Sequence, residues 1–295
     1  MDRERKPEPG VSPGQVSSAA TTALTLCYSA PMPGCGSRYA DRDVAHETRL
    51  LGVPLLSAAL GYAGERAVGE VVLDAVTAAR RLTGSADLRV AGALAPLARS
   101  ALLGQRLGLV LRRLTHRDVR AFARALEVSG AGGALAGAIE VTLGAGKEAT
   151  LRDAMRFAAN RDPLAREYSR GFEVTRQLAY PSLMSALGRA EAIRSALVQA
   201  YLEVLAEVPD LDVEARAGRK EAEEVSRMAR GVLKAGGVYS RRGVQQISNL
   251  NGLLRSDPRL YPSATEPVVA AAAFLTAVEN GAEFLNYRVR PALQP

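Results

Sequence analysis

The sequence contains no tryptophan, and phenylalanine and tyrosine together make up only 5% of its 295 residues. A core with so few aromatic rings must be filled mainly by aliphatic side chains. Alanine and leucine are abundant instead, and both are strong helix formers. We therefore expect a core of helices that approach one another closely over small side chains.

Cysteine and histidine are almost absent. The only cysteines are Cys27 and Cys35, too few for a disulfide scaffold. The only histidines, His46 and His116, lie far apart in the sequence, which excludes a zinc site of nitrogen and sulfur ligands. A magnesium ion stays open, because it needs only carboxylates and the phosphates of a substrate.

Lysine is scarce as well, and it occurs only at Lys6, Lys147, Lys220 and Lys234. The formal net charge of +7 is therefore carried almost entirely by arginine. A basic excess favours anionic partners such as nucleotides or other phosphorylated small molecules. Because the charge is spread along the chain without interleaved aromatic residues, we expect no nucleic-acid partner.

Long apolar runs are also missing. The stretch at residues 19–27 is interrupted by threonines and is too short to span a bilayer, and no convincing cleavage region follows it. We expect a cytoplasmic protein without a membrane partner. Residues 1–15 are polar and rich in proline and glycine, which predicts a disordered tail.

What the sequence does contain is helical periodicity almost everywhere. In residues 65–82, for example, apolar side chains fall on one face of a helix. No segment alternates with period two between hairpin turns, no repeat of 20–50 residues is visible, and no linker divides the chain. The prediction is an all-α, single-domain multi-helix bundle over residues 16–290.

Several helix starts have local signals. The first helix is expected from Val16, and Thr115 and Thr150 are suited to cap the helices that follow them. Asp162 and Pro163 combine a capping acceptor with a proline in the first turn, which predicts a helix continuing to about Ala179.

The predicted breaks have weaker signals. Residues 44–62 are expected to form one or two short helices, broken near Pro54. Residues 213–235 are expected to form one uninterrupted helix. The glycines between Gly130 and Gly146 predict a long loop with room for a short helix, either a lid over a pocket or a solvated loop.

Four stretches carry more than composition does, and each matches a motif of one family. They are GEVVLDAVTAARRLTGSADLRVAGALAPLARSA (69–101), MRFAANRDPLAREYSRGFEV (155–174), LVQAYLEVLAEVPDLDVEARAGRKEAEEVSRMAR (197–230) and RLYPSATEPVVAAAAFLTAV (259–278). They keep the order and nearly the spacing of the patterns T-N-T-N-L-G with L-A-P-L-A, A-A-x-R-D-x-x-A-R-x-Y-x-x-G-F, L-E-L-L-A-x-x-P-D-T-L-I-x-R-K-x-G and R-L-N-P-G-T-T-A-D-L. Over about residues 21–278 the chain therefore resembles the triphosphoribosyl-dephospho-CoA synthase family (ATP:dephospho-CoA triphosphoribosyltransferase), in particular its archaeal-type members.

The resemblance implies a transferase for which ATP is a substrate. Enzymes of this family join the triphosphoribosyl part of ATP to the ribose of dephospho-CoA and release adenine. Breaking a ribosyl C–N bond builds positive charge on the sugar, which carboxylates stabilise. Arginine binds phosphate through its planar fork of donors, so an arginine-rich helical pocket suits this substrate.

The matched motifs supply the candidate site residues. The resemblance assigns catalysis to Asp162, Glu203 and Asp210. It assigns substrate binding to Asp87, Arg161, Arg166, Glu167, Tyr168 and Arg216. The candidate Mg²⁺ ligands are Asp87, Asp162 and Asp210. A purely structural role stays open for both Asp162 and Asp210, since a helix cap has the same sequence signature.

Several family residues are replaced. The loop P-K-P-G-N-V is Pro31–Gly36 here, without its lysine and asparagine, and T-N-T-N-L-G is Gly84–Arg89, with one acid left. A glutamate before the loop falls on Leu26, the asparagine of the last motif is Tyr261, and its aspartate is Pro267. These losses remove groups that would position phosphate, sugar or metal.

Two alternatives to the family reaction follow from these losses. The chain is either a divergent enzyme of archaeal-type one-carbon cofactor biosynthesis, acting on methanopterin or methanofuran precursors, or a non-catalytic helical scaffold that has lost the site. Assembly into a homo-oligomer is open in each case.

Overall fold

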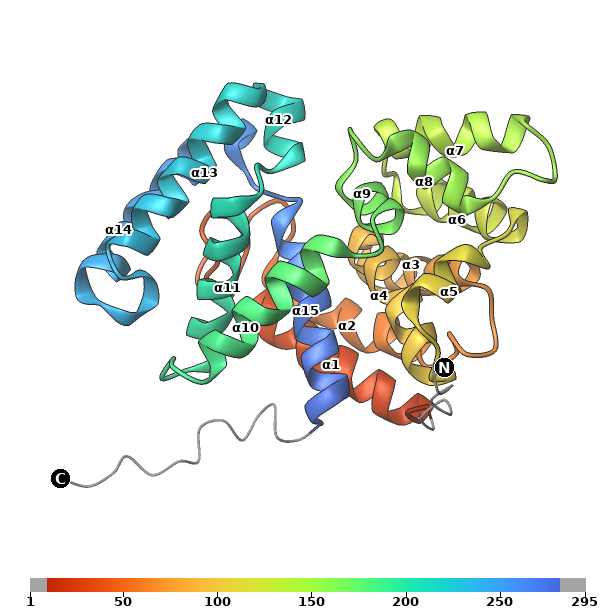
Figure 1. The fold of residues 1–295 in the computed structure, drawn as a ribbon, viewed down its shortest axis with the longest axis horizontal. Helices are drawn as coiled ribbons and strands as arrows, with labels where there is room; N and C mark the ends of the chain where they lie inside the picture. Colours follow the sequence, from red (N-terminus) through yellow and green to blue (C-terminus); the bar gives the residue numbers. More distant parts are fainter. Residues whose placement is uncertain (1–9, 282–295) are drawn as a thin grey trace, which may run out of the picture.

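The computed structural model describes residues 10–281, and this range is α-helical without any β-strand (Figure 1). The fold class predicted from periodicity is therefore confirmed. Two parts of the prediction lie outside the described residues. They are residues 1–9 of the predicted tail and residues 282–290 of the predicted domain.

Fifteen α-helices follow one another along the described chain, with one π-helix and two short 3-10 helices between them. Their bounds are α1 (Pro13–Ser29), α2 (His46–Leu60), α3 (Val68–Thr83), α4 (Leu88–Leu103), α5 (Leu107–Arg112), α6 (His116–Ser129), α7 (Ala134–Gly144), α8 (Leu151–Ala158), α9 (Pro163–Ser169), η1 (Val174–Ala179, the π-helix), α10 (Tyr180–Leu187), α11 (Ile193–Glu207), α12 (Leu211–Ala217), α13 (Arg219–Lys234), η2 (Gly237–Tyr239), α14 (Arg241–Ser256), η3 (Pro258–Leu260) and α15 (Thr265–Asn280).

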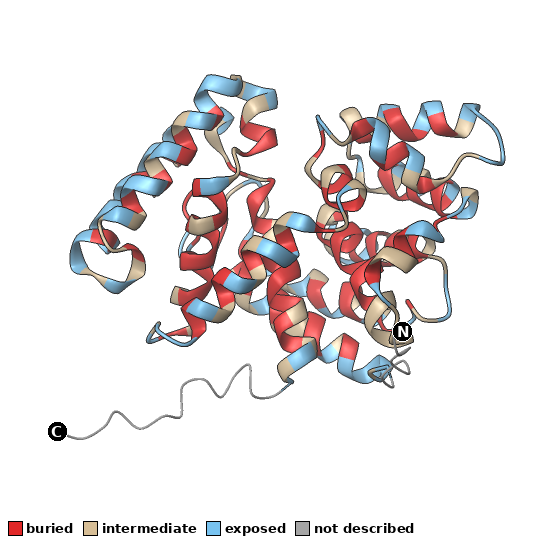
Figure 2. Cartoon of the chain, in the orientation of Figure 1, coloured by how far each residue is buried: buried red, intermediate tan, exposed pale blue. Residues whose placement is uncertain are grey.

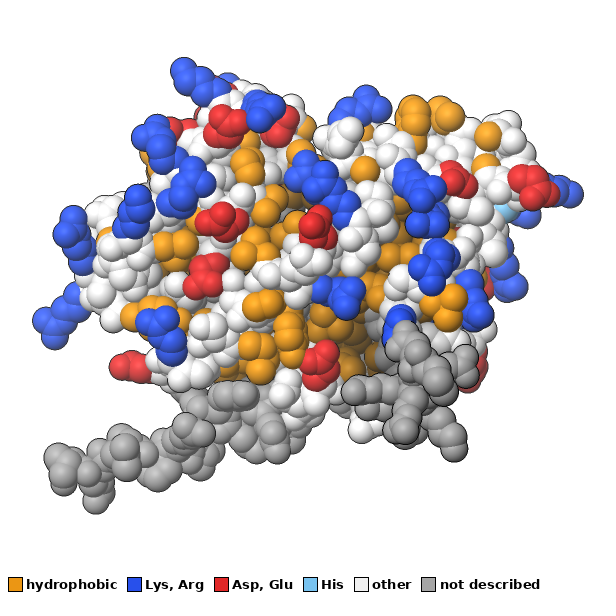
Figure 3. Space-filling view, viewed as in Figure 1, with side chains coloured by type: hydrophobic (Ala, Val, Ile, Leu, Met, Phe, Trp, Pro, Cys, Tyr) orange, Lys and Arg blue, Asp and Glu red, His pale blue; other side chains and the backbone are white. Residues whose placement is uncertain are grey.

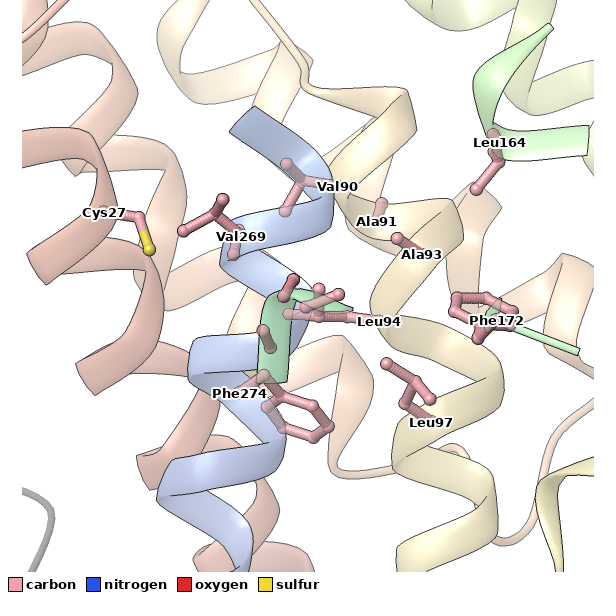
Figure 4. Close-up of a cluster of buried hydrophobic side chains, with 14 of the residues drawn as sticks. Cys27, Val90, Ala91, Ala93, Leu94, Leu97, Leu164, Phe172, Val269 and Phe274 are labelled. Carbon is pink, nitrogen blue, oxygen red and sulfur yellow. The ribbon is translucent and has the colours of Figure 1, made fainter. Parts of the chain in front are cut away.

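Helix α15 lies at the centre of the molecule and packs against α1, α4, α10 and α11 (Figure 1). Its residues Val269–Phe274 are completely buried and include four consecutive alanines, which let the neighbouring helices approach closely. In Figure 4, Val269 of α15 lies between Cys27 of α1 and Val90 of α4. The core is aliphatic and alanine-rich, as the scarcity of aromatic residues predicted.

Helix α3 shows how closely the helices approach. All six apolar residues of its predicted inner face are buried: Val68, Val71, Val72, Ala75, Val76 and Ala79. A Cβ atom on Gly69 would lie 2.3 Å from the carbonyl oxygen of Asp118 in α6, so only glycine permits this contact. The Gly69 amide also donates a hydrogen bond of 3.0 Å to the Asp118 side chain.

The predicted helix caps are confirmed. Thr115 and Thr150 each form a capping box with the aspartate three residues later, and the Asp162 carboxylate accepts from the backbone of α9. The first helix starts at Pro13, ahead of the expected Val16, because Ser12 caps it in a reciprocal pair with Gln15.

Two predicted helix limits were wrong, and one predicted loop contains a longer helix than expected. Pro54 does not break α2, because it lies on the exposed face, where water can solvate the backbone carbonyl that loses its helical partner. Residues 213–235 do not form one helix, because Gly218 (φ 107°) separates α12 from α13. The loop expected at Gly130–Gly146, with room for a short helix, contains an eleven-residue helix, α7, with Leu135 and Ile139 buried.

The helix predicted to run from Pro163 to Ala179 ends at Ser169. Gly171 and Phe172 both have positive φ, 68° and 61°, and a π-helical turn follows. Phe172 is completely buried, so packing outweighs the backbone strain of its left-handed conformation.

Surface and interior are distributed as in a folded bundle. Figure 2 shows buried residues along α1, α11 and α15, and exposed outer faces on α13 and α14. Figure 3 shows Lys and Arg side chains dispersed over one face rather than gathered in a single patch. Within residues 10–281, no helix combines the length and the apolar character that crossing a membrane requires.

Candidate active site

A cavity of about 440 Å³ lies where the ends of several helices meet. Its wall comes from α1, α2, the end of α3, the loop before α4, the end of α6, the loop before α7, the cap of α9 and the residues that lead into α15. Its polar and charged lining residues are Tyr28, Arg42, Asp43, Thr48, Arg49, Thr83, Ser85, Asp87, Arg89, Ser129, Asp162, Tyr261, Ser263 and Glu266. Residues from widely separated parts of the sequence thus share one hollow, which we call the main cavity.

An ion pair between Arg49 and Glu266 forms part of this wall, with 2.8 Å between Arg49 Nη2 and Glu266 Oε1. The Arg49 guanidinium also lies 3.8 Å from the ring centroid of Tyr28 and donates to the carbonyl of Gly36. Burial raises the pKa of Glu266, and the positive charge of Arg49 acts against this rise. Arg49 is therefore occupied in holding the wall.

Asp87 connects to the same network through Tyr28, whose hydroxyl donates to Asp87 Oδ2 at 3.1 Å. The other oxygen of Asp87, Oδ1, caps α4 by accepting from the Val90 amide at 3.0 Å. Asp87 therefore caps α4 and also lines the main cavity.

Asp162 combines the same two features at α9. It caps the helix by accepting from the Ala165 amide at 2.9 Å, and it lines the main cavity. Burial raises its pKa, which its backbone hydrogen bonds and the nearby charge of Arg89 lower in part. Because the carboxylate occupies the Ala165 N–H at the start of α9, the group that this helix start presents to the cavity is the Asp162 carboxylate.

Arg89 brings a second cation to the wall. It forms a two-pronged ion pair with Asp212 of α12, and Ser263 also donates to Asp212, at 2.6 Å. Burial alone would lower the pKa of Arg89, but the charge and hydrogen bonds of Asp212, together with the charges of Asp162 and Asp210, raise it. The pair holds Arg89 in place beside Asp162.

Arg42 is the cation of the main cavity with the weakest charge compensation. Its side chain is 11% exposed and stacks 4.6 Å from the ring centroid of Tyr261. The carboxylate paired with it belongs to Asp43, which lies 3.9 Å away on a side chain that is 77% exposed. Water screens such a pair strongly, so Asp43 neutralises little of the positive charge of Arg42, and that charge is available to a ligand.

Asp210 is buried, and hydrogen-bond donors surround both of its carboxylate oxygens. One oxygen accepts from the amides of Asp212 and Val213 at the start of α12. The other accepts from the amides of Ala264 and Thr265 and from the Thr265 hydroxyl. Asp210 therefore fastens the start of α12 to the start of α15, and it is absent from the lining of the main cavity.

The other two residues predicted in the third motif also lie apart from the main cavity. Glu203 is half-buried on α11, where it accepts from the Gln199 side chain at 2.8 Å. Arg216 is exposed, and it donates to the Tyr261 carbonyl and the Ser263 hydroxyl. Arg216 thereby supports the loop that carries two cavity residues.

The remaining residues of the second motif hold the fold around Asp162. Glu167 accepts from the amides of Val174 and Thr175, which secures the start of the π-helix. Tyr168 is buried and donates to the Gly92 carbonyl at 2.7 Å. Arg161 is exposed at the start of α9, and Arg166 is half-buried with its Nε atom unpartnered beside a small cavity of about 30 Å³.

The structure therefore brings only two of the nine predicted site residues, Asp87 and Asp162, into the main cavity. Of the three expected magnesium ligands, Asp87 and Asp162 line the main cavity and Asp210 does not. Among residues 10–281, no group of three or more acidic, histidine or cysteine side chains is arranged to hold a metal ion. A metal would have to be held by two carboxylates and by phosphate oxygens of a ligand.

The sequence reasoning missed Arg42, Arg49, Arg89 and Glu266. Arg89 stands where the family pattern has glycine, and Glu266 stands immediately before Pro267, the position of the family aspartate. The carboxylate judged lost in the last motif is thus supplied one residue earlier. The position of Glu266 next to Pro267 could have identified it as a candidate from the sequence. The pairing of Arg49 with Glu266 could not be predicted in this way, because it depends on tertiary structure.

Comparisons with known proteins point in one direction. Residues 13–284 match the family model described as ATP:dephospho-CoA triphosphoribosyl transferase. No curated protein matches the chain. A crystal structure from Archaeoglobus fulgidus, of a protein named for triphosphoribosyl-dephospho-coA synthase, superposes with a TM-score of 0.58 and 23% identity. The superposition covers 79% of this chain and 99% of the other, and it supports the same fold.

Proposed function

The chain belongs to the ATP:dephospho-CoA triphosphoribosyl transferase family, and from this premise we propose that its main cavity binds ATP and positions the ribosyl carbon for transfer to dephospho-CoA. The observation that carries the proposal is the composition of the cavity. It gathers the carboxylates of Asp87, Asp162 and Glu266 with the guanidinium groups of Arg42 and Arg89. These are the two kinds of group that a sugar triphosphate needs around it.

The chemistry can be written as a substitution at C1′ of the ATP ribose. The bond from C1′ to adenine breaks, the electron pair leaves with adenine, and a bond forms from C1′ to a ribose hydroxyl oxygen of the acceptor. The acceptor hydroxyl loses a proton and adenine gains one, so the overall reaction is balanced. Two needs follow: an acceptor for the hydroxyl proton and negative charge beside the positively charged sugar.

We assign to Asp162 the role of accepting the proton from the acceptor hydroxyl group. Burial raises the pKa of Asp162, which makes its carboxylate a better proton acceptor. The Ala165 amide donates to Oδ1 of this carboxylate, which lines the main cavity. A carboxylate in the wall of the cavity can accept the proton of a hydroxyl group that binds there.

Asp87 is the residue we assign to the positive charge of the sugar. Tyr28 and the Val90 amide fix its orientation from two sides. A carboxylate held in this way needs no reorganisation as charge develops, which is the condition for effective electrostatic stabilisation.

Arg42 and Arg89 are the residues we assign to the triphosphate. A magnesium ion fits this arrangement, because Asp87 and Asp162 offer the hard oxygen ligands that Mg²⁺ prefers, and the triphosphate supplies others. When bound, the ion would neutralise phosphate charge.

A scaffold that had lost its site would have little reason to retain these groups. Removing charges from water is costly unless they are paired, and several of them are half-buried or buried around a hollow rather than replaced by apolar residues. No feature of the cavity favours a one-carbon cofactor precursor over ATP.

The proposal is tested by incubating the purified chain with ATP, Mg²⁺ and dephospho-CoA. Adenine is then quantified by chromatography, and the acceptor product is identified by mass. We expect adenine and the triphosphoribosyl adduct in equal amounts, and neither of them without dephospho-CoA. Hydrolysis of ATP to ADP without adenine, or no reaction with either substrate, would contradict the proposal.

A further inference from the structure

A second cavity, of about 340 Å³, lies on the other side of the loop that follows α1. Cys35 in this loop lines the second cavity, and the next residue, Gly36, lines the main cavity. The rest of the second cavity comes from the first half of α11, from η2 and from α14. Only the width of one loop therefore separates the two hollows.

The loop between them is fixed from α14 and α11. The Arg255 guanidinium donates to the carbonyls of Cys35 and Asp41, and Asn251 accepts from the Gly34 amide at 3.0 Å. The Tyr201 hydroxyl donates to the Pro33 carbonyl at 2.9 Å. A loop held by so many contacts is a wall between two sites.

The lining of the second cavity differs from that of the main cavity, because it contains no carboxylate. Its apolar part includes Met32, Val198 and Ile247, and its neutral polar part includes Ser195, Ser248 and Asn251. Two cations also line it, Arg194 and Arg255, and Arg255 is engaged by the backbone carbonyls of the loop. Apart from these two arginines, the surface suits an uncharged chain of alkyl and amide groups. The sugar triphosphate, by contrast, finds its charged partners in the main cavity.

The proposed reaction requires a place for such a chain. Dephospho-CoA brings only a ribose hydroxyl to the reacting carbon, while its pantetheine arm, an extended series of two amides and alkyl groups, must lie elsewhere. The main cavity is at the low end of the range of about 300–1,000 Å³ that a single ligand of drug size occupies. The arm of a second substrate therefore needs separate space nearby.

We propose that the second cavity binds the pantetheine arm of the acceptor. This inference rests on the proposed function and adds the acceptor site to it. Met32 and Cys35 stand where the family loop has lysine and asparagine, and both line the second cavity rather than the main one. The replacements in this loop thus change the acceptor side of the protein and leave the donor side intact.

The test uses substitutions on the exposed part of α14. Val244 is 53% exposed and Ser248 is exposed, and both line the second cavity, so V244R and S248R fill it without disturbing the core. The matched control is L253R, because Leu253 is 42% exposed on the same helix and is absent from the lining. We expect V244R and S248R to raise KM for dephospho-CoA about tenfold or more, with KM for ATP unchanged and L253R behaving as wild type.

A second arm of the experiment separates this inference from the proposed function. Binding of 4′-phosphopantetheine to the wild type and the three variants is measured by calorimetry, which needs no turnover. Loss of binding in V244R and S248R, but not in L253R, supports the acceptor site even if adenine is never released. Equal binding by all four proteins, or variants that raise KM for ATP instead, would overturn it.

Discussion

Arg49 and Glu266 form an ion pair across 217 positions of the sequence, with their side chains only 14% and 6% exposed. The contact ties α2 to the first turn of α15 and holds the guanidinium group over the ring of Tyr28. Because Tyr28 in turn orients Asp87, the pair determines the shape of the wall that faces the proposed substrate.

Removing one partner of this pair leaves the other charge buried and uncompensated. We expect Glu266→Ala to lower the free energy of unfolding by about 3–5 kcal/mol, measured by urea denaturation. The control is Glu223→Ala, which breaks an ion pair with Arg219 on the exposed face of α13, where water screens the charges. A similar shift of the denaturation midpoint in both variants would show that the buried pair is not special.

Asp162→Asn tests chemistry separately from folding. Asparagine also caps helices, so the variant keeps the start of α9, but it cannot accept a proton. We expect the rate of adenine release to fall by about 10²–10⁴-fold, with little change in melting temperature. The matched control is Asp153→Asn, in the capping box of α8 and away from the main cavity, and it should retain full activity. Retained activity in Asp162→Asn would remove Asp162 from the mechanism.

Asp210 should act on stability rather than on turnover. Burial raises its pKa to about 6, with the negative charge of Asp212 adding to the effect. A folded-state pKa above the unfolded value means that the folded protein holds the proton more tightly. The contribution of this group is therefore fully present below pH 4 and is lost as pH rises toward 6.

The measurement compares the wild type with Asp210→Asn, which does not titrate. The stability advantage of the wild type over the variant should shrink by about 3 kcal/mol between pH 4 and pH 6, since one pKa unit corresponds to about 1.36 kcal/mol. Urea denaturation at several pH values gives both curves. A difference between the two proteins that is constant over this range, or that grows, would be inconsistent with the raised pKa.

Local signals in the sequence predicted most of the helices because capping is a local interaction. Thr150 with Asp153, and Asp162 with Pro163, mark helix starts through contacts that span three residues. Where tertiary packing decides, local signals underestimated the extent of the helix. Residues 134–144 form a helix within a glycine-rich stretch because Leu135 and Ile139 reach the core.

The candidate site was predicted less well, for a related reason. An aspartate that caps a helix and an aspartate in an active site have the same sequence signature. Asp87 and Asp162 cap helices and also line the main cavity, whereas Asp210 only joins two helices. The partner of Arg49 is 217 positions away, so no local pattern connects it with Glu266. The family resemblance located the right helix ends, and the fold decided which side chains face the hollow.

The assignment of Arg42 to the triphosphate leads to a prediction about charge. We expect Arg42→Gln to weaken ATP binding about 10–100-fold, because a hydrogen bond to a charged group contributes about 1.5–3 kcal/mol. Adenosine, which lacks phosphate, should bind the variant and the wild type equally, and calorimetry with the two ligands gives the comparison. The control is Arg38→Gln, on an exposed arginine that stacks on Tyr39 outside the main cavity. If Arg42→Gln weakened adenosine as much as ATP, the arginine would be shaping the cavity and not binding phosphate.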